Sequence, residues 1–300
     1  MSENTKTSSR SAVFICALAL FGEVSLTLRY SSNLVSDLLG FVAALLLIAG
    51  AFFALPLFTR ALQKIPFCAS IFFKGAVLIL SALISLLLAF SSALTFSHFA
   101  ADFMRPLFGS VFVLICFAVF CAFAAAQKIS LFGKLAIILL PISAVFLLFI
   151  LGFSVGFMDI KYLIPYKAPD FSLIRHTFSS VVLVCLPTVV PLAVTLGRLS
   201  KAQKVASFII FTVLLAICFI SPLALFGSEL SSTLSYPYSS AVGTAAIGDI
   251  FSRLDPLFYT VAFFSCFFKA ALSLKAFLLF IEKFFCKILN FTIEKYDKLW

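Results

Sequence analysis

Two ionisable side chains, Glu23 and Lys269, occur inside apolar stretches of the sequence. Lys269 follows Asp255 by about 21 Å along a helix axis, at ~1.5 Å per residue. An ionised group at such a depth in lipid is costly, so each side chain should face protein or water. Glu23 is therefore a candidate partner of Lys269. The chemistry that this pair predicts is the binding of a charged ligand or an ion.

Gly22 precedes Glu23, and its missing side chain lets the backbone loosen or a ligand approach. A structural alternative stays open, in which Gly22 serves helix packing and Glu23 extends to the outer interface. A second candidate stretch is LPTVVP, in which Pro187 and Pro191 bracket Thr188. The carbonyls that the prolines free need partners, which a ligand or ion could supply. A simple proline kink is the alternative.

Catalytic chemistry has little support in the sequence. Its two histidines, His98 and His176, lie near predicted helix ends, and we find no glycine-rich phosphate loop or nucleophile motif. No Cys/His spacing suggests a metal site. We therefore expect no enzyme activity, no catalytic residues, no metal and no cofactor.

The composition indicates what must position these residues. Hydrophobic residues make up 63% of the 300 residues and charged residues 11%, and the mean hydropathy is +1.19. Soluble domains are roughly 45–50% apolar and about 25% charged. We predict an all-α polytopic membrane protein of about eight transmembrane helices at ~20 residues each. The expected spans are 11–28, 34–58, 71–97, 107–126, 134–157, 174–196, 203–226 and 256–281.

The basic residues predict the orientation of these spans. Fifteen Lys and Arg fall on one side of the predicted membrane and six on the other. By the positive-inside rule, both termini are cytoplasmic. The net charge of +10 then reflects topology and attraction to the lipid bilayer, and we expect no nucleic-acid partner.

Four stretches of the sequence resemble the GerAB-type family of spore germination proteins, the B subunits of germinant receptors. The fifth helix and its loop (134–150 and 159–165) and the proline helix with its basic turn (186–204) match the family pattern. So do SYPYSSAVGTAAIGDIFSRLDPLF (235–258) and the lysine-bearing FFKAALSLKAF (267–277). This family is similar to amino-acid permeases of the APC superfamily.

The resemblance implies a LeuT-like bundle of inverted repeats, with a ligand site between the first and sixth helices. It implies binding roles for Gly22, Glu23, Pro187, Thr188, Pro191 and Lys269. Residues 227–255 would form an external lid-like loop. Residues 1–281 would form one transmembrane bundle, and 282–300 a cytoplasmic amphipathic tail.

The sequence also departs from the family pattern. The family has ten helices and this sequence predicts eight, so we expect a bundle without the last two. Val189 and Val190 stand near positions where the family commonly has a glycine and an acidic residue. Both departures favour a subunit that stabilises its partners without binding a ligand.

Three functions follow. The leading one is a germinant-receptor subunit in the cell membrane or inner spore membrane. It would sense a small germinant such as an amino acid and signal to A-type and C-type (lipoprotein) subunits. The alternatives are a non-binding structural or assembly subunit of the same complex, and an APC-type amino-acid transporter.

Overall fold

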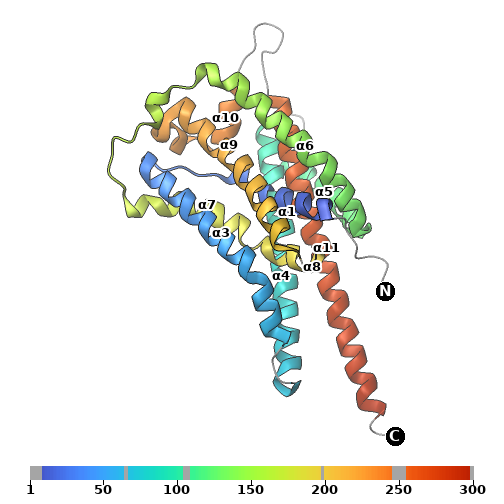
Figure 1. The fold of residues 1–300 in the computed structure, drawn as a ribbon. Coiled ribbons are helices and arrows are strands. Elements are labelled where there is room, and N and C mark those ends of the chain that lie inside the picture. The colour runs from blue at the N-terminus through green and yellow to red at the C-terminus, as the bar shows by residue number, and fades with distance from the viewer. Residues whose placement is uncertain (1–8, 64–66, 104–108, 197–198, 245–254, 298–300) are drawn as a thin grey trace.

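The computed structural model describes residues 9–63, 67–103, 109–196, 199–244 and 255–297 (Figure 1). This part of the chain is helical and contains no strand, which confirms the predicted all-α class. The helices are α1 Ser9–Phe21, α2 Val24–Thr27, α3 Leu34–Gln63, α4 Phe67–Phe103, α5 Ser110–Ala126, α6 Ile129–Ser154, α7 Phe171–Cys185, α8 Val189–Leu196, α9 Lys201–Thr233, α10 Pro237–Thr244 and α11 Asp255–Asp297. Two short 3-10 helices, η1 Val155–Phe157 and η2 Ile160–Leu163, follow α6.

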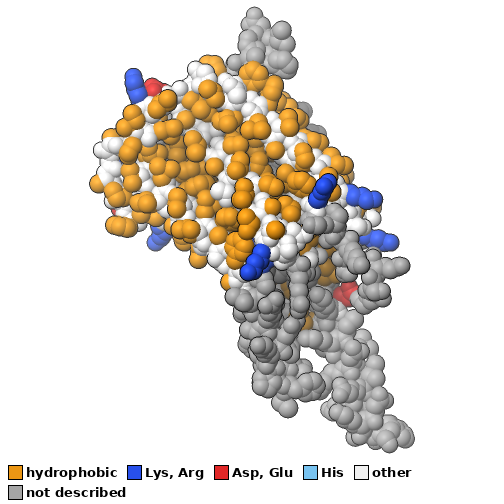
Figure 2. All heavy atoms as spheres, viewed as in Figure 1, with side chains coloured by type: hydrophobic (Ala, Val, Ile, Leu, Met, Phe, Trp, Pro, Cys, Tyr) orange, Lys and Arg blue, Asp and Glu red, His pale blue; other side chains and the backbone are white. Residues whose placement is uncertain are grey.

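Within the described residues, seven helical segments are long and apolar enough to cross a membrane. The remaining expected span, 107–126, corresponds to α5, an apolar helix of 17 residues. At 1.5 Å per residue it is about 26 Å long, close to the ~30 Å hydrocarbon thickness. Figure 2 shows a face covered mainly by hydrophobic side chains with few charges among them. The chain is a multi-pass membrane protein.

The first helix lies inside the bundle. Every residue from Ile15 to Phe21 is fully buried, and α1 packs against α6, α9 and α11 (Figure 1). A helix that is apolar on all sides, as α1 is over this stretch, is stable only when protein surrounds it. The break that follows α1 therefore lies in the interior.

Helices α4 and α11 form a long antiparallel pair beside α1. Phe99 stacks edge-on against Phe258 at one end of the contact, and Phe96 against Phe263 one turn further along. Gly75 approaches Phe284 at the other end. Helix α11 brings Lys269 into the interior, and α4 carries Ser91, which is exposed, next to Glu23.

The expected external loop 227–255 is partly helical. Helix α9 continues to Thr233 beyond a kink at Gly227, whose φ of 71° lies in the left-handed region that favours glycine. Tyr162 packs against this glycine, 3.1 Å from where a Cβ would stand. Helix α10 follows, and 245–254, with Gly248, Asp249 and Arg253, lie outside the described residues. A lid function for this loop stays a prediction.

The expected tail 282–300 begins inside a helix. Helix α11 runs from the last span to Asp297 as one element of 43 residues. The position of this tail relative to the membrane stays a prediction.

Candidate functional site

The centre of the candidate site is a buried ion pair between Lys269 on α11 and Glu23 after α1. The Lys269 Nζ lies 3.3 Å from Glu23 Oε1, and both side chains are at most 1% exposed. The pairing joins residues 246 positions apart in the chain. A buried pair of this kind compensates the desolvation of its two charges only where further hydrogen bonds complete it.

One of these further hydrogen bonds comes from the interrupted helix formed by α7 and α8. Lys269 Nζ donates to the Val184 carbonyl at 2.9 Å, and Thr188 Oγ1 donates to the same oxygen at 2.9 Å. A regular helix would supply the Thr188 N–H to this carbonyl, but that N–H bonds to the Cys185 carbonyl at 3.1 Å. The break between α7 and α8 thus makes the Val184 carbonyl available to the lysine.

The prolines explain why α7 stops at this point. Pro187 has no N–H to continue the ladder of helical hydrogen bonds, although Leu186 before it keeps helical backbone angles (φ −61°, ψ −46°). Pro191 lies one turn later inside α8, and Val190 supplies its N–H to the Pro187 carbonyl at 3.1 Å. Pro187 therefore acts on the pair through the backbone, and Pro191 lies further along α8.

The break between α1 and α2 approaches Lys269 closely. Gly22 has a φ of 27°, and a Cβ at this position would lie 2.4 Å from Lys269 Cδ and 3.2 Å from Lys269 Cβ. Such a distance is far below van der Waals contact, so this position accommodates only glycine while the lysine keeps its place. Cys185 adds a second link between the breaks, because its Sγ donates to the Leu20 carbonyl at 3.4 Å.

Helix α4 completes the surroundings of the carboxylate. Ser91 Oγ donates to Glu23 Oε1 at 3.2 Å. Among the described residues, three buried polar atoms of this region have no hydrogen-bond partner: Glu23 Oε2 and the hydroxyls of Ser25 and Ser92. The site therefore retains hydrogen-bonding capacity that the protein does not use.

Four of the six candidate residues meet at this centre. Gly22, Glu23 and Lys269 are in direct contact, and Thr188 shares the Val184 carbonyl with the lysine. The alternative in which Glu23 extends to the outer interface does not occur. Sequence reasoning did not find Ser91 or Val184, because neither a serine on a helix face nor a backbone carbonyl has a distinctive pattern.

A second buried carboxylate, Asp37 in the first turn of α3, also escaped the sequence analysis. Its Oδ1 accepts hydrogen bonds from the Ser31 N–H at 2.7 Å and from Thr177 Oγ1 at 2.6 Å. Asn33 caps the same helix end, accepting from the Val35 N–H at 3.0 Å. The sequence SSNLVSD contains the usual helix-capping residue types, and this signal was available. Asp37 thus ties α3 to α7.

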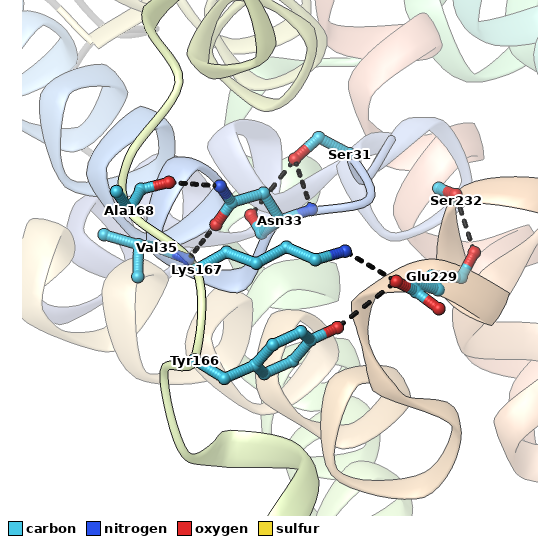
Figure 3. A network of polar contacts seen from close by, with 8 residues as sticks. All are labelled: Ser31, Asn33, Val35, Tyr166, Lys167, Ala168, Glu229 and Ser232. Carbon is cyan, nitrogen blue, oxygen red and sulfur yellow. Dashed lines mark hydrogen bonds and ion pairs between the residues drawn. The ribbon is translucent and has the colours of Figure 1, made fainter.

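An exposed network lies at the end of the bundle where α3 and α7 begin (Figure 3). Lys167 Nζ pairs with Glu229 Oε1 at 2.6 Å, and the Tyr166 hydroxyl donates to the same oxygen at 3.3 Å. Asn33 Nδ2 donates to the Ala168 carbonyl at 2.6 Å. The segment between η2 and α7 therefore bridges the end of α9 and the start of α3.

Two groups of this exposed segment have shifted pKa values. The hydrogen bond to Glu229 raises the pKa of Lys167 above its usual value. Hydrogen bonds from Ser172, the second residue of α7, lower the pKa of Asp170. Asp170 accepts from the Ser172 N–H at 2.8 Å and so caps α7.

These features define a class of protein: a helical membrane protein with two interrupted spans, the first and the sixth, joined at depth by a lysine from the eighth. The particular family follows from comparison. The sequence profile of the family described as "Spore germination protein" (Spore_permease) matches residues 73–293, most of the chain, and the chain belongs to this family. No curated protein matches the sequence. The matched region contains Val184, Thr188 and Lys269, while Gly22 and Glu23 precede it.

Proposed function

We propose that the chain is the permease-like membrane subunit of a spore germinant receptor. In this role it senses a small germinant such as an amino acid and passes the signal to partner subunits. Membership of the spore germination family supports a role of the chain in germination. The observation that carries the mechanism is the Lys269 ammonium, which bonds to residues of both broken helices at once.

The ion pair gives the bundle an element with two states. With the pair formed, Lys269 holds the breaks of the first and sixth spans together. A ligand that binds better to an arrangement in which these breaks have moved shifts the population toward that arrangement. The two interrupted spans lie five spans apart in the chain, as the inverted repeats of a LeuT-like bundle require. This spacing supports the permease-like architecture.

The proposed membrane orientation follows from the distribution of basic residues, and the proposed partner subunits follow from the family. The fifteen-to-six division of basic residues supports cytoplasmic termini in the inner spore membrane or cell membrane. The partners in this proposal are the A-type subunit and the C-type lipoprotein of the receptor. Their contacts would displace some of the lipid that the apolar exterior otherwise meets.

The test of this function is germination of spores that carry Lys269→Ala in place of the native chain. We expect germinant-dependent release to fail while the protein is still present in the spore membrane by immunoblot. Lys275→Ala is the matched control, because Lys275 lies on the same helix away from the pair. Normal release by the Lys269→Ala spores at a normal protein level would contradict the proposal.

A second candidate function is a structural subunit that binds no ligand. The close approach of Lys269 to Gly22 favours it, because the lysine stem fills space that a ligand at the break would need. Co-purification from spore membranes addresses this function. A chain that retains its A-type and C-type partners after Lys269→Ala, with release unchanged, would be a structural subunit. Uptake of an amino acid by proteoliposomes of the chain alone would instead indicate a transporter.

A further inference from the structure

A cavity of about 810 Å³ with both polar and apolar lining residues lies one helical turn beyond the buried ion pair. Its walls come from α2, the connection from α2 to α3, α4, α7 and the segment after α9. Ser31 and Ser232, both drawn in Figure 3, are part of the lining. The volume falls within the roughly 300–1,000 Å³ of sites that hold small molecules. The break at Gly22, in contrast, is filled by the lysine stem.

We propose that this cavity binds a small solute with a carboxylate group, so that the ligand of this subunit sits outward of the two helix breaks. The inference rests on the proposed function in one respect, since it takes this solute to be the germinant. The binding itself is a property of the isolated chain and can be measured without spores.

The charge of the lining selects an anion. Arg29 carries a permanent positive charge and is exposed, and both histidines of the protein, His98 and His176, line the same cavity. Among the described lining residues there is no Asp or Glu. An arginine guanidinium binds a carboxylate through two parallel hydrogen bonds, which makes this pairing geometrically specific.

Two carboxylates that hydrogen bond to lining residues, Asp37 and Asp102, have their partners within the protein. Asp37 accepts from Ser31 and Thr177, and Asp102 at the end of α4 accepts from the Tyr236 hydroxyl. Burial together with the Asp102 charge and hydrogen bond raises the pKa of Tyr236, which keeps its proton. Neither carboxylate hydrogen bonds to Arg29 in the described structure, so the guanidinium is available to a ligand.

The single arginine among the described lining residues indicates a carboxylate in preference to a phosphate. A phosphate group carries up to two charges at neutral pH and three acceptor oxygens, and clustered cations usually hold it. Among the described lining residues, one permanent cation is accompanied by neutral hydroxyl groups, such as those of Ser32, Thr95 and Ser235. This set matches one negative charge next to groups that form neutral hydrogen bonds.

The backbone of Arg29 connects the cavity to both broken helices. Its N–H donates to Ser180 Oγ at 3.3 Å, and its carbonyl accepts from Thr177 Oγ1 at 3.0 Å. Both partners belong to α7, whose penultimate residue, Val184, supplies the carbonyl used by Lys269. On the other side, Thr27 Oγ1 donates to the Glu23 carbonyl at 3.2 Å across α2. A ligand held by Arg29 therefore acts on elements that position the ion pair.

The test uses the purified full chain in lipid nanodiscs. The twenty standard amino acids, with simple monocarboxylates, are screened by thermal shift, and each amino acid that stabilises the chain is compared with its amide by calorimetry. We expect a carboxylate ligand to bind and its amide to lose affinity. Arg29→Gln should weaken binding about 10- to 100-fold, the equivalent of losing a charge-assisted hydrogen bond. Arg29→Lys should recover part of this loss.

Two controls locate the site. Arg175→Gln removes another exposed arginine, which lies on α7 outside the lining, and should leave the affinity unchanged. The double variant Glu23→Gln/Lys269→Met removes the central pair without leaving a buried charge unpaired, and should reduce the affinity less than Arg29→Gln does. A larger loss in this double variant would place the ligand at the helix breaks and overturn the proposal.

Other results would also overturn it: no stabilisation of the wild-type chain by any carboxylate, equal binding of acid and amide, or tighter binding of inorganic phosphate than of the carboxylates. Failure of the proposed function gives a different result. If the cavity binds a carboxylate through Arg29 but Arg29→Gln spores germinate normally, the binding site stands and the sensing role does not.

Discussion

Among the described residues, two lysine–carboxylate pairs link helices or segments of the bundle, one exposed and one buried. Lys167 and Glu229 approach to 2.6 Å with side chains 44% and 65% exposed, whereas Lys269 and Glu23 stand 3.3 Å apart at 0% and 1%. The outer pair has the shorter distance, but water and salt screen it and solvate either partner when the other is absent. Water cannot solvate either member of the inner pair in this way, because both side chains are buried. Burial, more than distance, decides how strongly each pair couples its helices.

The partners of the two pairs differ as well. Around the outer pair, Tyr166 shares the Glu229 oxygen in an exposed segment (Figure 3). Around the inner pair, Ser91 and the Val184 carbonyl come from two further spans. Loss of the inner lysine thus affects four elements, and loss of the outer lysine releases one connecting segment.

The largest expected effect is that of Lys269→Met. The substitution leaves the Glu23 carboxylate buried without its cation, which typically costs about 3–5 kcal/mol. We expect a lower free energy of unfolding of the chain in detergent, measured by denaturant titration. Lys275→Met, on the same helix, should have a much smaller effect. Equal effects of the two substitutions would show that burial of the pair does not govern its strength.

The double variant Glu23→Gln/Lys269→Met should be more stable than Lys269→Met alone. Replacing both members of a buried pair by neutral groups of similar size is often close to neutral. We expect most of the loss to be recovered in a double-mutant cycle of the free energies of unfolding. Additive effects of the two substitutions would contradict direct coupling between Glu23 and Lys269.

Gly22→Ala tests the close approach of the first break to the lysine. The added Cβ meets Lys269 Cδ at 2.4 Å, and the positive φ is strained for alanine, so we expect destabilisation of about 1–3 kcal/mol. Gly50→Ala is the matched control, because nothing lies within 4 Å of its added Cβ. It should be neutral or slightly stabilising, and a comparable loss in both variants would refute the steric explanation.

Lys167→Ala should have the smallest effect, at most about 1 kcal/mol, because exposed ion pairs contribute little. The loss should shrink further at high salt, where the Debye length falls to about 3 Å at 1 M. Measuring the free energy of unfolding at low and high salt checks both points. A salt-independent loss as large as that of Lys269→Met would mean that the two pairs are equivalent.

Part of the site was predictable from local patterns. A charged residue inside an apolar span is recognisable from the sequence, and so is a doublet of prolines in a helix, which is why Glu23, Lys269 and Pro187 were found. Ser91 and Asp37 were not. An exposed serine on a membrane helix such as α4 has no distinctive pattern, and Asp37 lies at a helix start where a solvated cap is common. Their roles depend on which helices face them.

The sequence by itself determined the class of the protein, its spans and the places where two helices break. Each of these follows from local composition, because lipid imposes a length and proline removes a hydrogen bond. The tertiary structure alone decided that Lys269 meets Glu23, that the Val184 carbonyl receives the lysine, and that Arg29 opens into a cavity. These contacts join spans far apart in the chain, and their geometry depends on helix rotation and packing, which no local pattern encodes.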